Sequence, residues 1–189
     1  MTPRHVFLDA CCIINLVATD RLKEVLGALP YTFWVSRYVL EEEVLLVGKP
    51  AADEGGELAP IDLSPLLRDG TLRTIDIETE KEAAELVRFA RDLDDGEAHT
   101  LALATVRDAW VATDDRKAIR ILREVRKAEL GEGGGVLRTS ELIFSWADRS
   151  RLADDELGKV LKDIEARASF FPPKGDPGYL RWRSLLKRS

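Results

Sequence analysis

The sequence predicts an α/β protein with a parallel sheet of four to five strands and helices on both faces of that sheet. Short runs of β-branched and aromatic residues alternate with segments of helical period, which is typical of parallel sheets with right-handed crossovers. The first run, residues 5–8, ends directly on Asp9, at the position where open α/β sheets bind ligands. With 189 residues the chain can bury one sizeable core.

Five runs have the length and residue types of strands. They cover residues 5–8, 31–35, 72–77, 109–113 and 136–139. The runs over 5–8, 31–35 and 109–113 are largely apolar, as in buried strands, whereas the run over 72–77 alternates and is expected near a sheet edge. The run over 136–139 is a weak strand candidate.

Helical spacing of apolar residues predicts the remaining segments. They cover residues 11–29, 37–47, 63–67, 80–91, 98–106, 116–129, 141–146, 156–168 and, as a basic amphipathic tail, 179–189. The first helix is expected to break near Thr19 and Asp20, and Ser36 is a good N-cap for the second. Residues 48–60 are rich in Gly, Pro and acids, so we expect a long connection there.

Composition is that of an ordinary globular protein, with 45% hydrophobic and 33% charged residues. We expect one domain over 1–150 and a C-terminal helical extension over 151–189 that packs on it. The net charge of −6 neither supports nor excludes a nucleic-acid ligand, because a local basic surface can still hold a phosphate backbone.

The sequence lacks a membrane helix, a signal peptide and cysteines that could form a long-range disulfide. No run approaches the roughly 20 apolar residues of a membrane helix, and Asp9 interrupts the one stretch that resembles a signal peptide. We therefore expect no membrane association and a cytoplasmic location. Cys11 and Cys12 are adjacent and cannot link distant segments, and with two histidines in the chain they form no Cys/His zinc motif.

Acidic residues recur where predicted strands end and helices begin. Asp9 and the pair Asp114-Asp115 follow strands directly, and Glu97 shares an apolar helical stripe with residues four and seven positions on. In the glutamate run over 41–43, periodicity favours 42 or 43 and does not choose between them. Each acid alone also has a structural explanation, since Asp95 and Asp115 are good N-caps.

Taken together, these acids would meet at one edge of the sheet, where carboxylates repel each other unless a cation holds them. Hard oxygen ligands without His or Cys select Mg²⁺ or Mn²⁺. Such a site is typical of metal-assisted phosphodiester hydrolysis.

The order of four short motifs resembles the PIN-domain ribonucleases, a family that includes toxins of the VapC type. The motifs are Val6-Phe7-Leu8-Asp9 with Ile13-Ile14-Asn15-Leu16, Val35-Ser36 with Val39-Leu40-Glu41-Glu42, Asp95-Gly96-Glu97-Ala98 with Leu101-Ala102-Leu103-Ala104, and Val111-Ala112-Thr113-Asp114-Asp115-Arg116-Lys117-Ala118. The resemblance covers residues 5–145 and implies a three-layer α/β/α sandwich with an acidic Mg²⁺ or Mn²⁺ site that cleaves RNA.

Carried over residue by residue, the resemblance places catalytic carboxylates on Asp9, Glu42, Glu97 and Asp115, and metal ligands on the same residues together with Asp114. It thus selects Glu42 over Glu43. Gly96-Glu97 stands where many members carry an Asp, a variation seen in a subgroup.

The expected partners are RNA, a second copy of the chain in a homodimer, and an antitoxin protein that covers the acidic cleft. We assign substrate binding to Ser36, Thr113, Arg116, Lys117 and Arg120. The basic helix face could equally be a solvated surface. Two hydrophobic sets are candidate protein contacts, with packing in their own core as the alternative. They are Ile13, Ile14, Leu16 and Val17, and Tyr179, Leu180, Trp182, Leu185 and Leu186.

Two other functions stay open. The first is a PIN-like module that binds RNA or protein without cleaving. The second is a phosphatase with Asp9 as nucleophile, whose haloacid-dehalogenase pattern would require an Asp where Cys11 stands.

Overall fold

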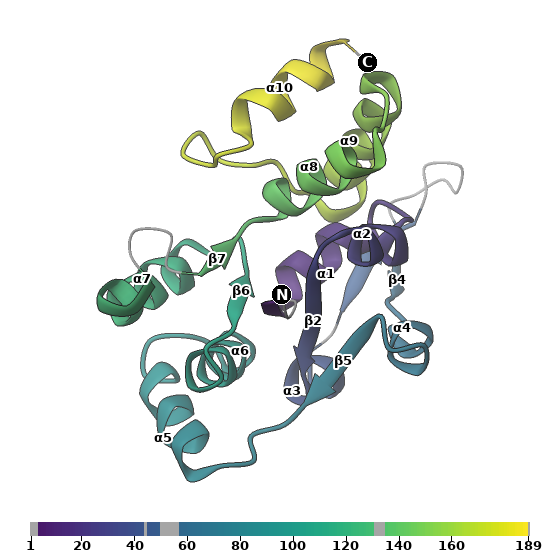
Figure 1. Ribbon diagram of the computed structural model, residues 1–189. Coiled ribbons are helices and arrows are strands. Elements are labelled where there is room, and N and C mark those ends of the chain that lie inside the picture. Colours follow the sequence, from purple (N-terminus) through teal and green to yellow (C-terminus); the bar gives the residue numbers. More distant parts are fainter. Residues whose placement is uncertain (1–3, 44, 50–56, 131–134, 189) are drawn as a thin grey trace. The chain divides into compact units, whose positions relative to one another are not determined.

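Five strands form one sheet in which every paired neighbour is parallel (Figure 1). The structure, a computed structural model, describes residues 4–43, 45–49, 57–130 and 135–188. The strand order is β5 (Leu72–Ile75), β2 (Tyr31–Ser36), β1 (Arg4–Leu8), β6 (Trp110–Ala112) and β7 (Val136–Leu137). All five predicted strands are confirmed, and β5 lies at an edge as its alternating pattern indicated.

The central strand β1 lies beside β2 and β6. Val6 of β1 is in register with Phe33 on one side and with Trp110 on the other. The chain runs from β1 to β2 in one direction and later enters β6 on the opposite side of β1, so the strand order reverses between β1 and β6. In α/β sheets the carboxyl ends of strands at such a reversal form the ligand crevice.

Contacts within the chain divide it into two compact units. The first comprises Met1–Cys12, Pro30–Glu43 and Ser64–Leu137, and the second Ile13–Leu29, Val44–Leu63 and Arg138–Ser189. The prediction of a domain over 1–150 with an extension over 151–189 stays a prediction.

The first unit holds the sheet and the helices that flank it, which confirms the predicted α/β architecture. Its helices are α3 (Arg37–Glu41), α4 (Ser64–Arg68), α5 (Glu80–Phe89), α6 (Asp95–Val106) and α7 (Arg116–Leu130). Phe7 and Val111 of the sheet pack in one cluster with Leu101 and Leu103 of α6 and Leu122 of α7. Burial of these side chains, at about 25 cal/mol per Å² of apolar area, is the main stabilisation of the unit.

The described part of the second unit contains a pair of short antiparallel strands and, besides the end of the first helix, four further helices. They are β3 (Leu46–Gly48), β4 (Leu58–Pro60), α2 (Leu22–Ala28), α8 (Thr139–Ser150), α9 (Asp154–Ala168) and α10 (Tyr179–Arg188). Trp182 of the basic tail is fully buried and makes edge-to-face contacts with Phe144 and Phe170. This buried tryptophan supports the packing alternative for the tail, although Leu180 stays 76% exposed.

The structure tests three predictions about the first two predicted helices. The first helix is broken as expected, into α1 (Ala10–Val17) and α2, with Asp20 in a left-handed conformation between them. Ser36 caps α3 by accepting a hydrogen bond from the Val39 N–H. The predicted extension of that helix to residue 47 was wrong.

Helix α3 ends at Glu41, because Leu46–Gly48 pairs with Leu58–Pro60 as a strand. The expected connection over 48–60 was therefore wrong at its two ends, while residues 50–56 lie outside the described residues.

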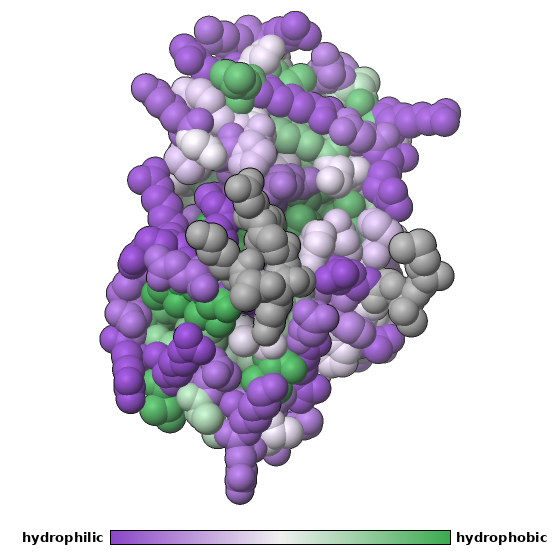
Figure 2. Space-filling model, turned by 60° about the vertical axis from the view of Figure 1, so that its left-hand side comes forward, coloured by the Kyte–Doolittle hydropathy of each residue, from purple (hydrophilic) through white to green (hydrophobic). Residues whose placement is uncertain are grey.

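On the face shown in Figure 2, hydrophilic side chains cover most of the surface and small hydrophobic areas interrupt it. None of the helices in the described ranges is long and apolar enough to cross a membrane.

Candidate active site

Asp9 lies at the carboxyl end of β1, where the strand order reverses. Its side chain is only 4% exposed. Oδ1 accepts a hydrogen bond of 2.9 Å from the Ala10 N–H, and Oδ2 accepts one of 2.8 Å from the Thr113 hydroxyl and one of 3.2 Å from the Cys11 thiol. Burial raises the pKa of Asp9, and these hydrogen bonds oppose the rise.

The end of β6 supplies the residues that hold Asp9 in place. Thr113 is fully buried, donates to Asp9 and accepts a hydrogen bond of 3.1 Å from the Asp115 N–H. Asp115 Oδ1 in turn accepts a hydrogen bond of 2.7 Å from the Ala118 N–H, so Asp115 caps α7 as predicted. Asp114 and Asp115 are half-buried.

The first turn of α6 brings Glu97 to the same acids. Asp94 caps this helix by accepting a hydrogen bond of 2.9 Å from the Glu97 N–H, so the expectation that Asp95 is the cap was wrong. Burial, followed by the charges of Asp115, Asp94 and Asp9, raises the pKa of Glu97 to about 7. Glu97 therefore lies close enough to Asp9, after β1, and to Asp115, after β6, for both charges to raise its pKa.

Glu43 completes the acidic group from the segment after α3. An added Cβ on Gly96 would lie 1.7 Å from Glu43 Oε1, so the Glu43 carboxylate rests against the backbone of α6 at the residue before Glu97. Burial and the charges of Asp94, Asp9 and Asp95 raise the pKa of Glu43.

Glu42, the residue selected by the resemblance, is exposed, and its charge acts on Tyr38. The helical spacing used to compare these two glutamates did not apply, because α3 ends before both. The structure therefore brings Glu43 to the acidic edge, and the role of Glu42 stays a prediction.

The acids at this edge are of the type that binds a hard divalent cation, but among the described residues their carboxylate oxygens do not form a group within 4.8 Å of one another. Among the described residues, the charges that raise the pKa values of Asp9, Glu43 and Glu97 are all those of other carboxylates. Carboxylate oxygens are the hard ligands that Mg²⁺ and Mn²⁺ prefer.

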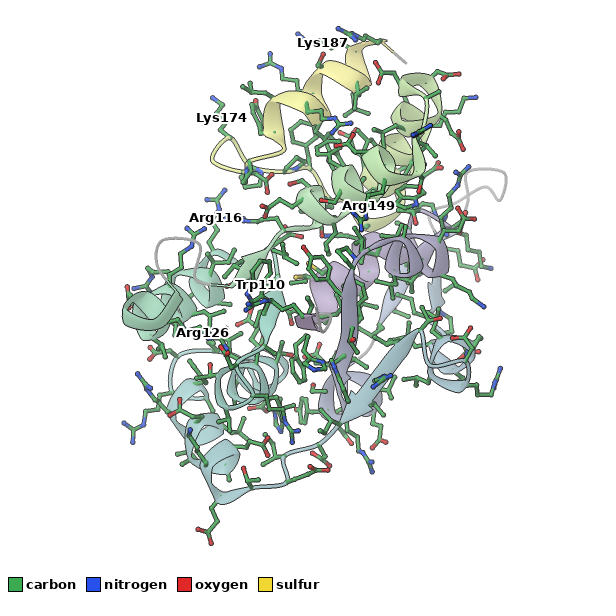
Figure 3. All side chains as sticks on the ribbon, in the orientation of Figure 1. Trp110, Arg116, Arg126, Arg149, Lys174 and Lys187 are labelled. Atoms are coloured by element: carbon green, nitrogen blue, oxygen red, sulfur yellow. The ribbon has the colours of Figure 1, made fainter. Side chains whose placement is uncertain are left out.

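The predicted substrate-binding residues fall into two groups. Ser36 and Thr113 are buried and make structural hydrogen bonds. Ser36 caps α3, and Thr113 donates to Asp9. Arg116, Lys117 and Arg120 are exposed on α7, and Arg116 projects from the start of that helix (Figure 3). Lys117 donates to the Asp92 carbonyl, and Arg120 pairs with Glu124 at 3.7 Å.

An aromatic pair beside the acids was missed by sequence reasoning. Tyr38 of α3 and His99 of α6 stack with ring centroids 4.3 Å apart and planes tilted by 12°. The Tyr38 hydroxyl donates to Asp95 at 3.3 Å, and His99 Nδ1 lies 2.7 Å from the Asp95 carbonyl oxygen. The two residues are 61 positions apart (99 − 38), and no local pattern indicates such a pair.

A parallel sheet with acids near the carboxyl ends of β1 and β6, where the strand order reverses, defines an α/β protein of the class that binds ligands at that edge. A family model described as PIN domain matches residues 5–133, which is more than half of the chain. The chain belongs to the PIN-domain family. None of the curated proteins compared with it matches.

Proposed function

We propose that this protein is a Mg²⁺- or Mn²⁺-dependent endoribonuclease, a PIN-domain hydrolase of RNA phosphodiester bonds. The observation that carries the proposal is the approach of Asp9, Glu43, Glu97 and Asp115 to one sheet edge, where burial, followed by the charges of Asp115, Asp94 and Asp9, raises the pKa of Glu97 to about 7. Family membership supports a nuclease activity for such an edge.

Asp9, Glu43, Glu97 and Asp115 would hold the ion, with Asp114 beside them; we favour Glu43 over Glu42 for this role because of its place against Gly96. The bound ion would lower the pKa of a water ligand and neutralise charge on the phosphate. Thr113 and the Ala10 N–H orient the Asp9 carboxylate, so that Asp9 presents a preset geometry.

Two features support single-stranded RNA as the substrate. The stacked Tyr38–His99 pair next to Asp95 offers an aromatic face on which an unpaired base can stack, the usual contact for single strands. Arg116, Lys117 and Arg120 provide positive charge on α7, which starts directly after Asp115. We propose that they guide the phosphate backbone.

The direct test is cleavage of a fluorescent single-stranded RNA by the purified protein. Cleavage with Mg²⁺ or Mn²⁺, its loss in EDTA and its loss in Asp9→Asn are the expected results. A matched comparison of Glu43→Gln with Glu42→Gln separates the two candidates for the second acid, and we expect the larger loss for Glu43→Gln. Tight RNA binding without cleavage under every metal condition would instead support the non-cleaving module.

We further propose that the protein is a toxin of the VapC type, belongs to the subgroup with Gly-Glu at the third acid, acts in the cytoplasm as a homodimer and is inhibited by an antitoxin. A bidentate Arg of the inhibitor could neutralise the carboxylates at the acidic edge. Co-expression with the product of an adjacent small gene should yield a complex without RNA cleavage, and light scattering should give the mass of two chains. If the complex cleaves RNA at the same rate as the protein alone, the partner is not an inhibitor and the antitoxin part of the proposal is wrong.

A further inference from the structure

The two adjacent cysteines begin α1 immediately after Asp9, and both thiols face the end of β6. Cys11 Sγ lies 3.2 Å from Asp9 Oδ2 and 3.7 Å from the Thr113 hydroxyl oxygen. Cys12 Sγ lies 3.6 Å from Asp114 Oδ2. Strand pairing produces this meeting, because Leu8 of β1 is in register with Ala112 of β6 and both chains continue past the sheet at the same level.

These groups form a compact donor set. The two sulfur atoms and one carboxylate oxygen of Asp114 all lie within 4.8 Å of one another, the one such His, Cys, Asp and Glu group found among the described residues. In tetrahedral zinc sites the Zn–S distance is about 2.3 Å and the Zn–O distance about 2.0–2.2 Å, so adjacent donors lie about 3.4–3.8 Å apart. The separation of 3.6 Å between Cys12 Sγ and Asp114 Oδ2 equals this spacing.

We propose that Cys11, Cys12 and Asp114 bind a thiophilic divalent cation, with Zn²⁺ as the natural ligand. Two sulfur donors distinguish this site from the neighbouring carboxylates, which select hard ions. The Asp9 carboxylate, in contact with Cys11, offers a fourth donor. Binding releases the two thiol protons to solvent, so the complex of Zn²⁺ with two thiolates and the Asp114 carboxylate has a net charge of about −1, or about −2 with the Asp9 carboxylate as fourth donor.

The site has a consequence for the neighbouring acids. Asp9 and Asp114 can serve either the thiol site or the acidic edge, so a zinc ion held by the cysteines competes with Mg²⁺ for the same side chains. This consequence rests on the proposed nuclease function, whereas the binding of zinc does not.

The experiment uses the full-length reduced protein and Co²⁺ as a spectroscopic probe. Tetrahedral thiolate coordination gives a sulfur-to-cobalt charge-transfer band in the near ultraviolet and intense visible bands, and one equivalent of Zn²⁺ should remove both. Zn²⁺ affinity is measured by competition with a chromophoric chelator. Cys11→Ser and Cys12→Ser should each lose charge-transfer intensity and weaken Zn²⁺ binding by at least about tenfold.

Glu43→Gln is the matched control, because it removes an acid of the cluster and none of the thiol donors. It should retain the charge-transfer band. X-ray absorption of the wild-type zinc complex gives a second readout that needs no variant, with an expected Zn–S distance of about 2.3 Å.

Octahedral Co²⁺ without a charge-transfer band, or a zinc shell of oxygen and nitrogen alone, would overturn the proposal. Because none of these measurements reads RNA cleavage, their failure and a failure of the nuclease assignment are distinguishable.

Discussion

The Thr113 hydroxyl donates a hydrogen bond of 2.8 Å to Asp9 Oδ2 across the pair formed by β1 and β6. This bond joins the two strand ends between which the strand order of the sheet reverses. It also holds a buried carboxylate whose solvation the chain must replace.

Replacing Thr113 by Val should therefore remove a donor from Asp9 and raise the pKa of Asp9 further. Loss of one hydrogen bond to a buried acid costs about 1–3 kcal/mol, so the free energy of unfolding should fall by that amount in urea denaturation. Thr113→Ser keeps the hydroxyl and serves as the control. Equal stability of the Val and Ser variants would show that the bond contributes nothing.

The raised pKa of Glu97 predicts how the stability of the metal-free protein depends on pH. A carboxyl that titrates at about 7 in the folded state and near 4.5 in the unfolded state stabilises the fold below pH 4.5 and loses that contribution as pH rises through 7. The free energy of unfolding should thus fall between pH 5 and pH 8, by on the order of 1–2 kcal/mol after solvent screening is allowed for.

Glu97→Gln should flatten this dependence, and saturating Mg²⁺ should also remove it by neutralising the acids. Thermal unfolding at several pH values measures both effects. A wild-type protein whose stability rises from pH 5 to pH 8 in EDTA would contradict the acidic cluster as described.

Gly96→Ala should separate stability from metal affinity. An Ala side chain in α6 improves helix propensity by about 0.5–1 kcal/mol, but its Cβ occupies the position of the Glu43 carboxylate and must displace it. We expect unchanged or higher stability together with weaker Mn²⁺ binding by calorimetry.

Gly27→Ala in α2 is the matched control, since an added Cβ there meets nothing within 4 Å. It should stabilise the protein without changing its Mn²⁺ affinity. Equal affinity in both variants would exclude Glu43 from the ion site.

The lowered pKa of Glu82 predicts that this residue's contribution to the free energy of unfolding changes with pH in the opposite direction to that of Glu97. Burial alone would raise the pKa of this carboxyl, but it accepts hydrogen bonds from the Glu78 and Thr79 N–H groups and pairs with Arg107 at 2.7 Å, and the net result is a lowered pKa. Its contribution is present above pH 4.5 and is lost as pH falls through the folded-state value.

Glu82→Gln should destabilise the protein by about 1–3 kcal/mol at pH 7, and the difference from wild type should shrink in acid. Glu80→Gln, an exposed acid in the same helical turn, should change stability by less than about 0.5 kcal/mol. Chemical denaturation at pH 7 and pH 4 provides the comparison.

The Tyr38–His99 stack predicts a loss of single-stranded RNA affinity in Tyr38→Ala and His99→Ala. Base stacking on an aromatic side chain is worth about 1–3 kcal/mol, so each variant should bind roughly 5- to 150-fold more weakly in fluorescence anisotropy. Tyr38→Phe keeps the ring and removes the hydroxyl, and it should bind like the wild type. Full affinity in both Ala variants would assign the pair to packing alone.

The alternation of apolar runs and helical periods determined the fold class from the sequence, because burial on a parallel sheet imposes both patterns locally. Local sequence also indicated that Asp9 directly follows a strand and that Asp115 caps the helix that it precedes. Tertiary structure alone decided the rest of the acidic edge. Glu43 reaches Gly96 because the pairing of Leu46–Gly48 with Leu58–Pro60 leaves no room for the longer helix that the spacing predicted.

The contacts that no sequence pattern indicated join residues far apart along the chain. Cys12 meets Asp114 across 102 positions, and Tyr38 meets His99. A single sequence records which side chains can bond or stack, but the approach of two such side chains depends on strand register and helix packing, which the whole chain sets together.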